Sequence, residues 1–280
     1  MKKINTGEEL NQIARFLFGE AASKWYIAAV LELTAGVLSG VFAVIERPDL
    51  LVMAGAVLGT TLILIAYLLR LWSVQQYGTA ETMRRQSVFT EALGWGVSKT
   101  QMSKWRQDAG KSTLEKIQRI PRDPNYYTTS KGVGYQKLAE MTLESAFYTR
   151  HLYGKIRLWV WIVFLVSAGI VTLVVAVTIT GTFPNQVELI VAKVLFAVIP
   201  TALAIDLLGW AIKLSQMVRE ICDIEESLER MLNDNSADLP QVLRIVSEYN
   251  CRVVTGIPIH DRIFQRWHDE IKIMWQKRWN

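Results

Sequence analysis

The stretch LLVMAGAVLGTTLILIAYLLRL, residues 50–71, decides the fold, because it carries no charged residue before Arg70. A helix rises about 1.5 Å per residue, so about 20 apolar residues are needed to cross the hydrocarbon core of a bilayer. Three further stretches meet this requirement: Trp25 to Ile45, Leu158 to Gly181 and Leu189 to Leu214. The sequence therefore predicts an all-α integral membrane protein with four transmembrane helices.

Short links join the predicted spans in pairs, ERPD within the first pair and TFPNQVE within the second, which indicates two helical hairpins. Apolar residues at helical spacing continue beyond the inner ends of the spans, so helical cytoplasmic extensions are expected. The predicted division is an N-terminal cytoplasmic helix 1–24, a hairpin 25–72, a central cytoplasmic region of helices and loop 73–157, a second hairpin 158–214 and C-terminal cytoplasmic helices 215–280.

The basic residues predict the orientation of the chain in the membrane. The segment from Ser73 to Lys155 holds thirteen Lys and Arg against seven Asp and Glu, whereas the two short links together hold one arginine. Basic loops stay on the cytoplasmic side. We therefore expect a multi-pass membrane protein with both termini in the cytoplasm.

Two carboxylates fall within predicted spans, Glu32 in the first and Asp206 in the fourth, both about 10 Å from the inner surface at ~1.5 Å per residue. A charge facing lipid is costly, so each should face protein or water. In an oligomer they would form acidic rings that line a pore for cations. The alternative is that each is protonated or pairs with Arg70, Arg157 or Lys213.

Glycine pairs in the first two spans predict close helix packing. Gly36 and Gly40 have the GxxxG spacing, as do Gly55 and Gly59, and such small faces let helices approach each other. Packing inside the hairpin is preferred to a contact between subunits.

No constellation of residues indicates an enzyme, so neither catalytic residues nor a cofactor are predicted. The run AGKST, residues 109–113, resembles the end of a phosphate-binding P-loop, but Trp105 stands where that motif needs glycine. The doublets His260-Asp261 and His268-Asp269 have no partner cluster, so no metal site is expected.

Basic and aromatic residues alternate in the central region. The cluster comprises Lys99, Lys104, Arg106, Lys111, Lys116, Arg119, Arg122 and Lys131, interleaved with Trp105, Tyr126, Tyr127 and Tyr135. Cations with stacking rings suit a small anionic nucleotide or a single strand. The alternative is that these charges only reflect orientation and attraction to anionic lipid.

Two segments resemble a known family. They are RRQSVFTEALGW, residues 84–95, and NYYTTSKGVGYQKLAEMTLESAFYTRHLYGKIR, residues 125–157. Together with the spans they are similar to the bacterial SMODS-associated four-transmembrane proteins, pore-forming effectors of nucleotide-signalling antiphage systems. The hairpins also resemble the related two-transmembrane domains of the same systems. Thr90 stands where the family pattern has Asp, and Tyr126-Tyr127 replaces a more usual Trp-Tyr.

The resemblance implies a membrane effector that oligomerises and permeabilises the inner membrane when a signal arrives. A cyclic nucleotide or oligonucleotide messenger, or a partner of the nucleotidyltransferase family, would supply that signal, and DNA is not expected. Residues expected to form the ligand or partner surface are Gln86, Phe89, Arg119, Arg122, Tyr126, Tyr127 and Arg150. Two alternatives stay open: a small ion channel or transporter, and a membrane-anchored scaffold or sensor that recruits a cytoplasmic protein.

Overall fold

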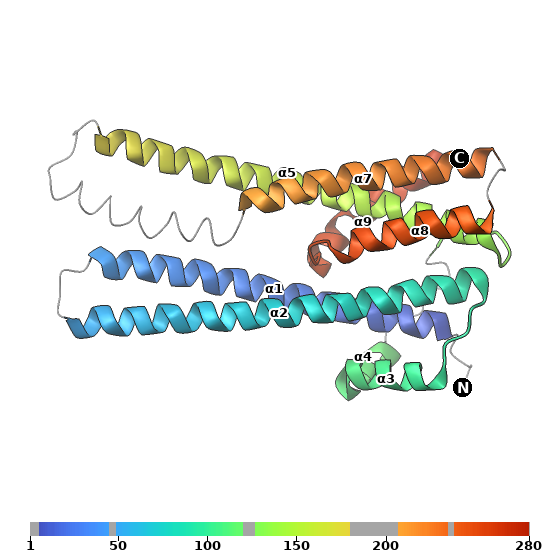
Figure 1. The fold of residues 1–280 in the computed structure, drawn as a ribbon, viewed down its shortest axis with the longest axis horizontal. Helices are drawn as coiled ribbons and strands as arrows, with labels where there is room; N and C mark the ends of the chain where they lie inside the picture. The colour runs from blue at the N-terminus through green and yellow to red at the C-terminus, as the bar shows by residue number, and fades with distance from the viewer. Residues whose placement is uncertain (1–5, 45–48, 120–126, 180–206, 235–237, 280) are drawn as a thin grey trace. The chain divides into compact units, whose positions relative to one another are not determined.

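The computed structural model describes residues 6–44, 49–119, 127–179, 207–234 and 238–279. Within these ranges the chain is helical and contains no strand, which confirms the predicted all-α class (Figure 1). The helices are α1 Thr6–Val44, α2 Asp49–Leu93, α3 Lys99–Ala109, α4 Lys111–Arg119, α5 Tyr135–Ile179, α7 Leu207–Asn233, α8 Leu239–Val254 and α9 Asp261–Trp279.

The chain divides into two compact units, each assembled from separate stretches. Unit 1 consists of Met1–Ala22, Ser73–Gly154 and Gln216–Asn280, and unit 2 of Ser23–Trp72 and Lys155–Ser215. Helices α1, α2, α5 and α7 each contribute residues to both units. A structural change along the whole of one of these helices therefore affects residues of both units.

Unit 2 exposes the apolar side chains that a soluble protein would bury. Leu64 in α2 is 58% exposed and Val166 in α5 is 57% exposed. Among the described residues, two helices are long and apolar enough to cross a membrane, Met53–Leu93 and Tyr135–Gly169. Most of the predicted fourth span, including Asp206, lies outside the described residues.

Close helix packing occurs inside the first hairpin. A Cβ atom added at Gly55 of α2 would overlap the ring of Phe42 in α1, so this glycine is needed for the two helices to approach. The Gly55 contact therefore has the form predicted from the GxxxG spacing, packing within one hairpin.

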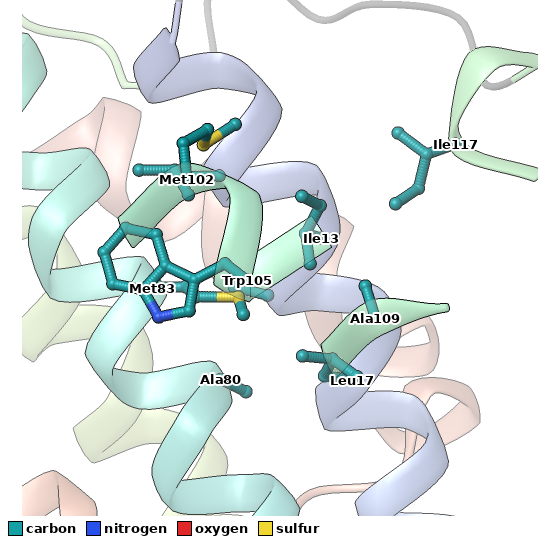
Figure 2. Packing of buried hydrophobic residues seen from close by; sticks show 10 residues of the cluster. Ile13, Leu17, Ala80, Met83, Met102, Trp105, Ala109 and Ile117 are labelled. Carbon is teal, nitrogen blue, oxygen red and sulfur yellow. The ribbon is translucent and has the colours of Figure 1, made fainter. Parts of the chain in front are cut away.

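Unit 1, in contrast, has a conventional buried core. Helix α3 presents Met102, Trp105 and Ala109 to α1 and α2, where Ile13 and Met83 are fully buried (Figure 2). Other members of this cluster are Leu10, Ala14, Leu17, Ala80 and Ile117. Part of the basic central region is therefore a helical pair fixed on the core of unit 1.

Local signals set the ends of these helices. The Ser98 hydroxyl accepts from the Gln101 backbone N–H at 3.1 Å and caps α3, and Gly110 ends it with φ 77°. The Asp238 carboxylate caps α8 by accepting from the Gln241 N–H at 2.9 Å, with Pro240 in the first turn.

Candidate functional site

Unit 1 contains a cavity of about 240 Å³, which we call the inner cavity. Its walls come from α1, α2, α5, α8 and α9 and from the segment that precedes α5. The polar and aromatic lining residues are Asn11, Arg15, Phe18, Tyr77, Glu81, Arg84, Tyr127, Thr128, Glu144, Ser145, Tyr148, Thr149, Tyr153, Tyr249, Phe264, His268 and Lys272. Five tyrosines and several cations therefore surround one cavity.

Two of the tyrosines are fixed by backbone carbonyls. The Tyr77 hydroxyl donates to the Val253 carbonyl at 3.1 Å, and the Tyr153 hydroxyl donates to the Ile257 carbonyl at 3.1 Å. Burial raises the pKa of both phenols, so both are neutral at physiological pH. Their rings form a rigid and uncharged part of the wall.

Arg84 is fixed by several partners at once. Its Nε lies 2.9 Å from the Glu81 carboxylate, its second nitrogen donates to the Asn250 side-chain oxygen at 3.1 Å, and its guanidinium lies 5.5 Å from the ring centroid of Tyr249. A guanidinium stays charged in proteins, so burying it without such partners would be costly. Helix α2 thereby places a charge of fixed position at the cavity wall.

The Glu144 carboxylate belongs to α5. It precedes Leu158 and is therefore outside the predicted span. One of its oxygens accepts from the Thr128 backbone N–H at 2.9 Å and from the Thr128 hydroxyl at 3.0 Å. Burial raises the pKa of this carboxyl, and the two hydrogen bonds from Thr128 oppose the rise. Lys272 of α9 adds a positive charge nearby.

The inner cavity combines aromatic rings with both cations and carboxylates, the latter from Glu81 and Glu144. Aromatic faces stack on planar rings, and arginine and lysine bind phosphate or carboxylate groups. A few placed polar groups in a mostly apolar cavity are typical of small-molecule sites. Among the described residues no cluster of three His, Cys, Asp or Glu could hold a metal ion.

The structure brings one predicted surface residue, Tyr127, to the inner cavity. Gln86 and Phe89 are half-buried on α2, and the Phe89 ring packs against Trp95 with centroids 5.2 Å apart. Arg150 instead pairs with Glu225 at 2.7 Å and so joins α5 to α7. The Arg119 side chain, Arg122 and Tyr126 lie outside what the structure describes.

Sequence reasoning missed most residues of the inner cavity. Arg15, Glu81 and Arg84 were not among the predicted site residues, although Glu81 is only 3% exposed. The available signal was a carboxylate and an arginine at i, i+3 spacing within a helix that also carries Tyr77 and Met83. Five helices form the cavity, and the residue pattern of a single helix does not show where five helices meet.

A second polar cluster lies within unit 2. Arg70 donates to both oxygens of Glu32, at 2.7 and 2.6 Å, and its guanidinium lies 5.0 Å from the Trp25 ring and 5.3 Å from the Trp210 ring. The two indole rings lie 4.4 Å apart. Pairing with Arg70, the alternative weighed for Glu32, is therefore the arrangement in this structure, and it joins α1, α2 and α7.

Comparison with known proteins found no matching family model, no matching curated protein and no matching solved structure.

Proposed function

We propose that this chain is a signal-gated membrane effector, in which unit 2 spans the bacterial inner membrane and unit 1 receives a cytoplasmic signal. In this proposal the chain crosses the membrane four times and oligomerises, and activation opens a pore that dissipates the ion gradient. The resemblance to the four-transmembrane effectors of antiphage systems motivates the setting in phage defence.

The observation that carries the proposal is the sharing of helices between the two units. Helices α1, α2 and α5 line the inner cavity and then continue into the unit whose apolar side chains are exposed. A ligand that binds one arrangement of these helices more tightly would shift the population toward that arrangement. In this proposal the inner cavity is the receiving site and the shared helices are the mechanical connection.

The chemistry of the inner cavity favours a small anionic ligand with an aromatic ring, as a nucleotide messenger would be. Tyr127 and Tyr148 offer stacking faces, and Arg15 and Lys272 offer positive charge. A protein partner of the nucleotidyltransferase family that docks on unit 1 is the other source of a signal. Membrane lipid surrounds unit 2 in either case.

Two other functions predict different behaviour. A small ion channel or transporter would pass ions without a trigger. A scaffold or sensor would recruit a cytoplasmic protein and cause no ion flux. Membrane potential therefore separates all three functions.

The test is inner-membrane potential, measured with a voltage-sensitive dye in bacteria that express the full chain, with and without phage challenge. Lys272→Glu reverses a charge at the inner cavity, whereas Lys277→Glu makes the same change on the exposed face of α9, away from the cavity. We expect depolarisation only on challenge, its loss in Lys272→Glu and its retention in Lys277→Glu.

The double variant Glu32→Gln, Asp206→Asn tests the predicted pore residues in the same assay. Unchanged depolarisation in this variant would reject these carboxylates as pore lining and keep the effector. Absence of depolarisation under every condition would contradict the effector and favour the scaffold.

A further inference from the structure

Unit 1 contains a second hollow beside the inner cavity. This outer cleft, of about 460 Å³, is lined by Thr128, Thr129, Ser130, Lys131, Glu140, Glu144, Trp275 and Gln276. Thr128 and Glu144 line both hollows. The partition between the outer cleft and the inner cavity therefore consists largely of these two side chains.

Residues 127–131, which we call the strap, carry Thr128 across this partition. The indole N–H of Trp275 donates to the Thr128 hydroxyl oxygen at 2.8 Å, and that hydroxyl donates to Glu144 at 3.0 Å. The Thr128 backbone N–H also donates to Glu144, at 2.9 Å. Because these hydrogen bonds share atoms, they polarise one another and form or break together.

A second attachment follows at the next residue of the strap. The Thr129 hydroxyl donates to the carboxylate of Glu140, which lies one turn before Glu144 on α5. Two carboxylates on one face of α5 thus hold two successive threonines.

Polar contacts hold Thr128 and Thr129 of the strap, and Tyr127 is half-buried at the inner cavity. Thr128, Ser130 and Lys131 are exposed, whereas Trp275 of the neighbouring helix is only 3% exposed. Segments with few buried apolar contacts open locally at a much lower free energy than helices of the core. The strap can therefore leave α5 while the helices of unit 1 stay packed.

We infer that the strap is a removable partition, which a ligand displaces from Glu144 and Trp275 so that the outer cleft and the inner cavity become one site. This inference describes how access to the proposed ligand site is regulated. It rests on the proposed function only in one respect, that the inner cavity binds a ligand. Strap release also frees the Trp275 indole N–H on α9.

The contacts of α9 give strap release a route to other helices. Arg278, one turn after Trp275, donates to Glu225 of α7, and the same carboxylate pairs with Arg150 of α5 at 2.7 Å. A shift of α9 would therefore act on an ion-pair network that joins α5, α7 and α9.

The experiment measures how fast a cysteine in the inner cavity reacts when the strap is intact or released. The full chain is prepared in detergent with Cys222→Ser and Cys251→Ser, and Ser145→Cys places a thiol at the cavity wall. The probe is a small charged methanethiosulfonate reagent. Thr128→Val removes the shared hydroxyl at nearly constant volume, and Thr82→Val makes the same change at an exposed threonine of α2 away from both hollows.

We expect labelling at Ser145→Cys to be about tenfold faster with Thr128→Val than with Thr82→Val, because a loss of about one to two hydrogen bonds raises the open population by about that factor. Trp275→Phe keeps an aromatic ring and removes only the donor, so it should accelerate labelling in the same direction. Ser112→Cys, exposed on α4 and away from both hollows, should label at one rate in all variants.

Equal labelling rates at Ser145→Cys in the Thr128→Val, Trp275→Phe and Thr82→Val backgrounds would overturn the inference. An equal acceleration at Ser112→Cys would also overturn it, because the change would then be a general loosening. The assay needs neither a signal nor ion flux, so its failure and the absence of depolarisation are separate results.

Discussion

Replacing Arg70 by leucine would leave the Glu32 carboxylate in unit 2 without the cation that binds both of its oxygens. The two side chains are only 20% and 14% exposed, so water compensates little for the lost partner. Removing one member of a buried ion pair typically costs about 3–5 kcal/mol. We expect Arg70→Leu to lower the free energy of unfolding by that amount, and loss of the contacts with Trp25 and Trp210 to add to it.

Two comparisons isolate the ion pair. The double variant Glu32→Leu, Arg70→Leu removes both charges, and such exchanges are often neutral or stabilising, so it should be more stable than Arg70→Leu alone. Arg230→Leu breaks the exposed pair of Arg230 with Glu226 on α7, whose side chains are 74% and 59% exposed. That change should cost under about 1 kcal/mol.

The assay is unfolding of the full chain in mixed micelles, followed by circular dichroism as the denaturing detergent fraction rises. A loss below about 1 kcal/mol in Arg70→Leu would refute the reasoning, because it would mean that the Glu32 carboxylate is satisfied by water. A double variant as unstable as Arg70→Leu would refute it as well. The first outcome would instead favour Glu32 as a residue that lines a water-filled pore.

Two further predictions concern unit 1. Gly256→Ala would place a Cβ against the Tyr153 hydroxyl and 2.9 Å from the Met217 methyl, so thermal unfolding should show a loss of about 1–3 kcal/mol, whereas Gly78→Ala, with open space around it, should be neutral or gain up to about 1 kcal/mol. Because burial raises the pKa of Glu144 above its ordinary 4.5, the folded chain binds this proton more tightly than the unfolded chain, and the stabilisation is complete below that value and lost as pH rises through the folded pKa. The Tm of the wild type should therefore rise relative to Glu144→Gln as pH falls from neutral toward 4.5, and a difference independent of pH would contradict the raised pKa.

Patterns local to one segment predicted the helical fold well. The apolar spacing before Trp25 predicted one continuous helix into the first span, and α1 runs from Thr6 to Val44. Such features depend on neighbours in sequence, which is why the sequence contains them.

The candidate site was predicted only in part, because its residues come together through tertiary packing. The sequence singled out Tyr127 by its basic surroundings, and this residue does line the inner cavity. It also singled out Arg150, whose partner Glu225 is distant in sequence, so the ion pair was not foreseen. In the C-terminal helix, Ile271 is 1% exposed and so is buried within unit 1.

The composition of unit 1 from three separated stretches has a consequence for how the protein is made. The helices that line the inner cavity include α1, which is synthesised early, and α9, which is synthesised after both predicted hairpins. Contacts between such distant segments form late, because the intervening chain must first be in place. During synthesis the charged wall of the inner cavity is therefore incomplete until both hairpins have emerged from the ribosome, and a nascent chain stalled before α9 would lack the helix that carries Lys272 and Trp275. Under the proposed function, the chain would thereby be unable to respond to a ligand before its translation and insertion are complete.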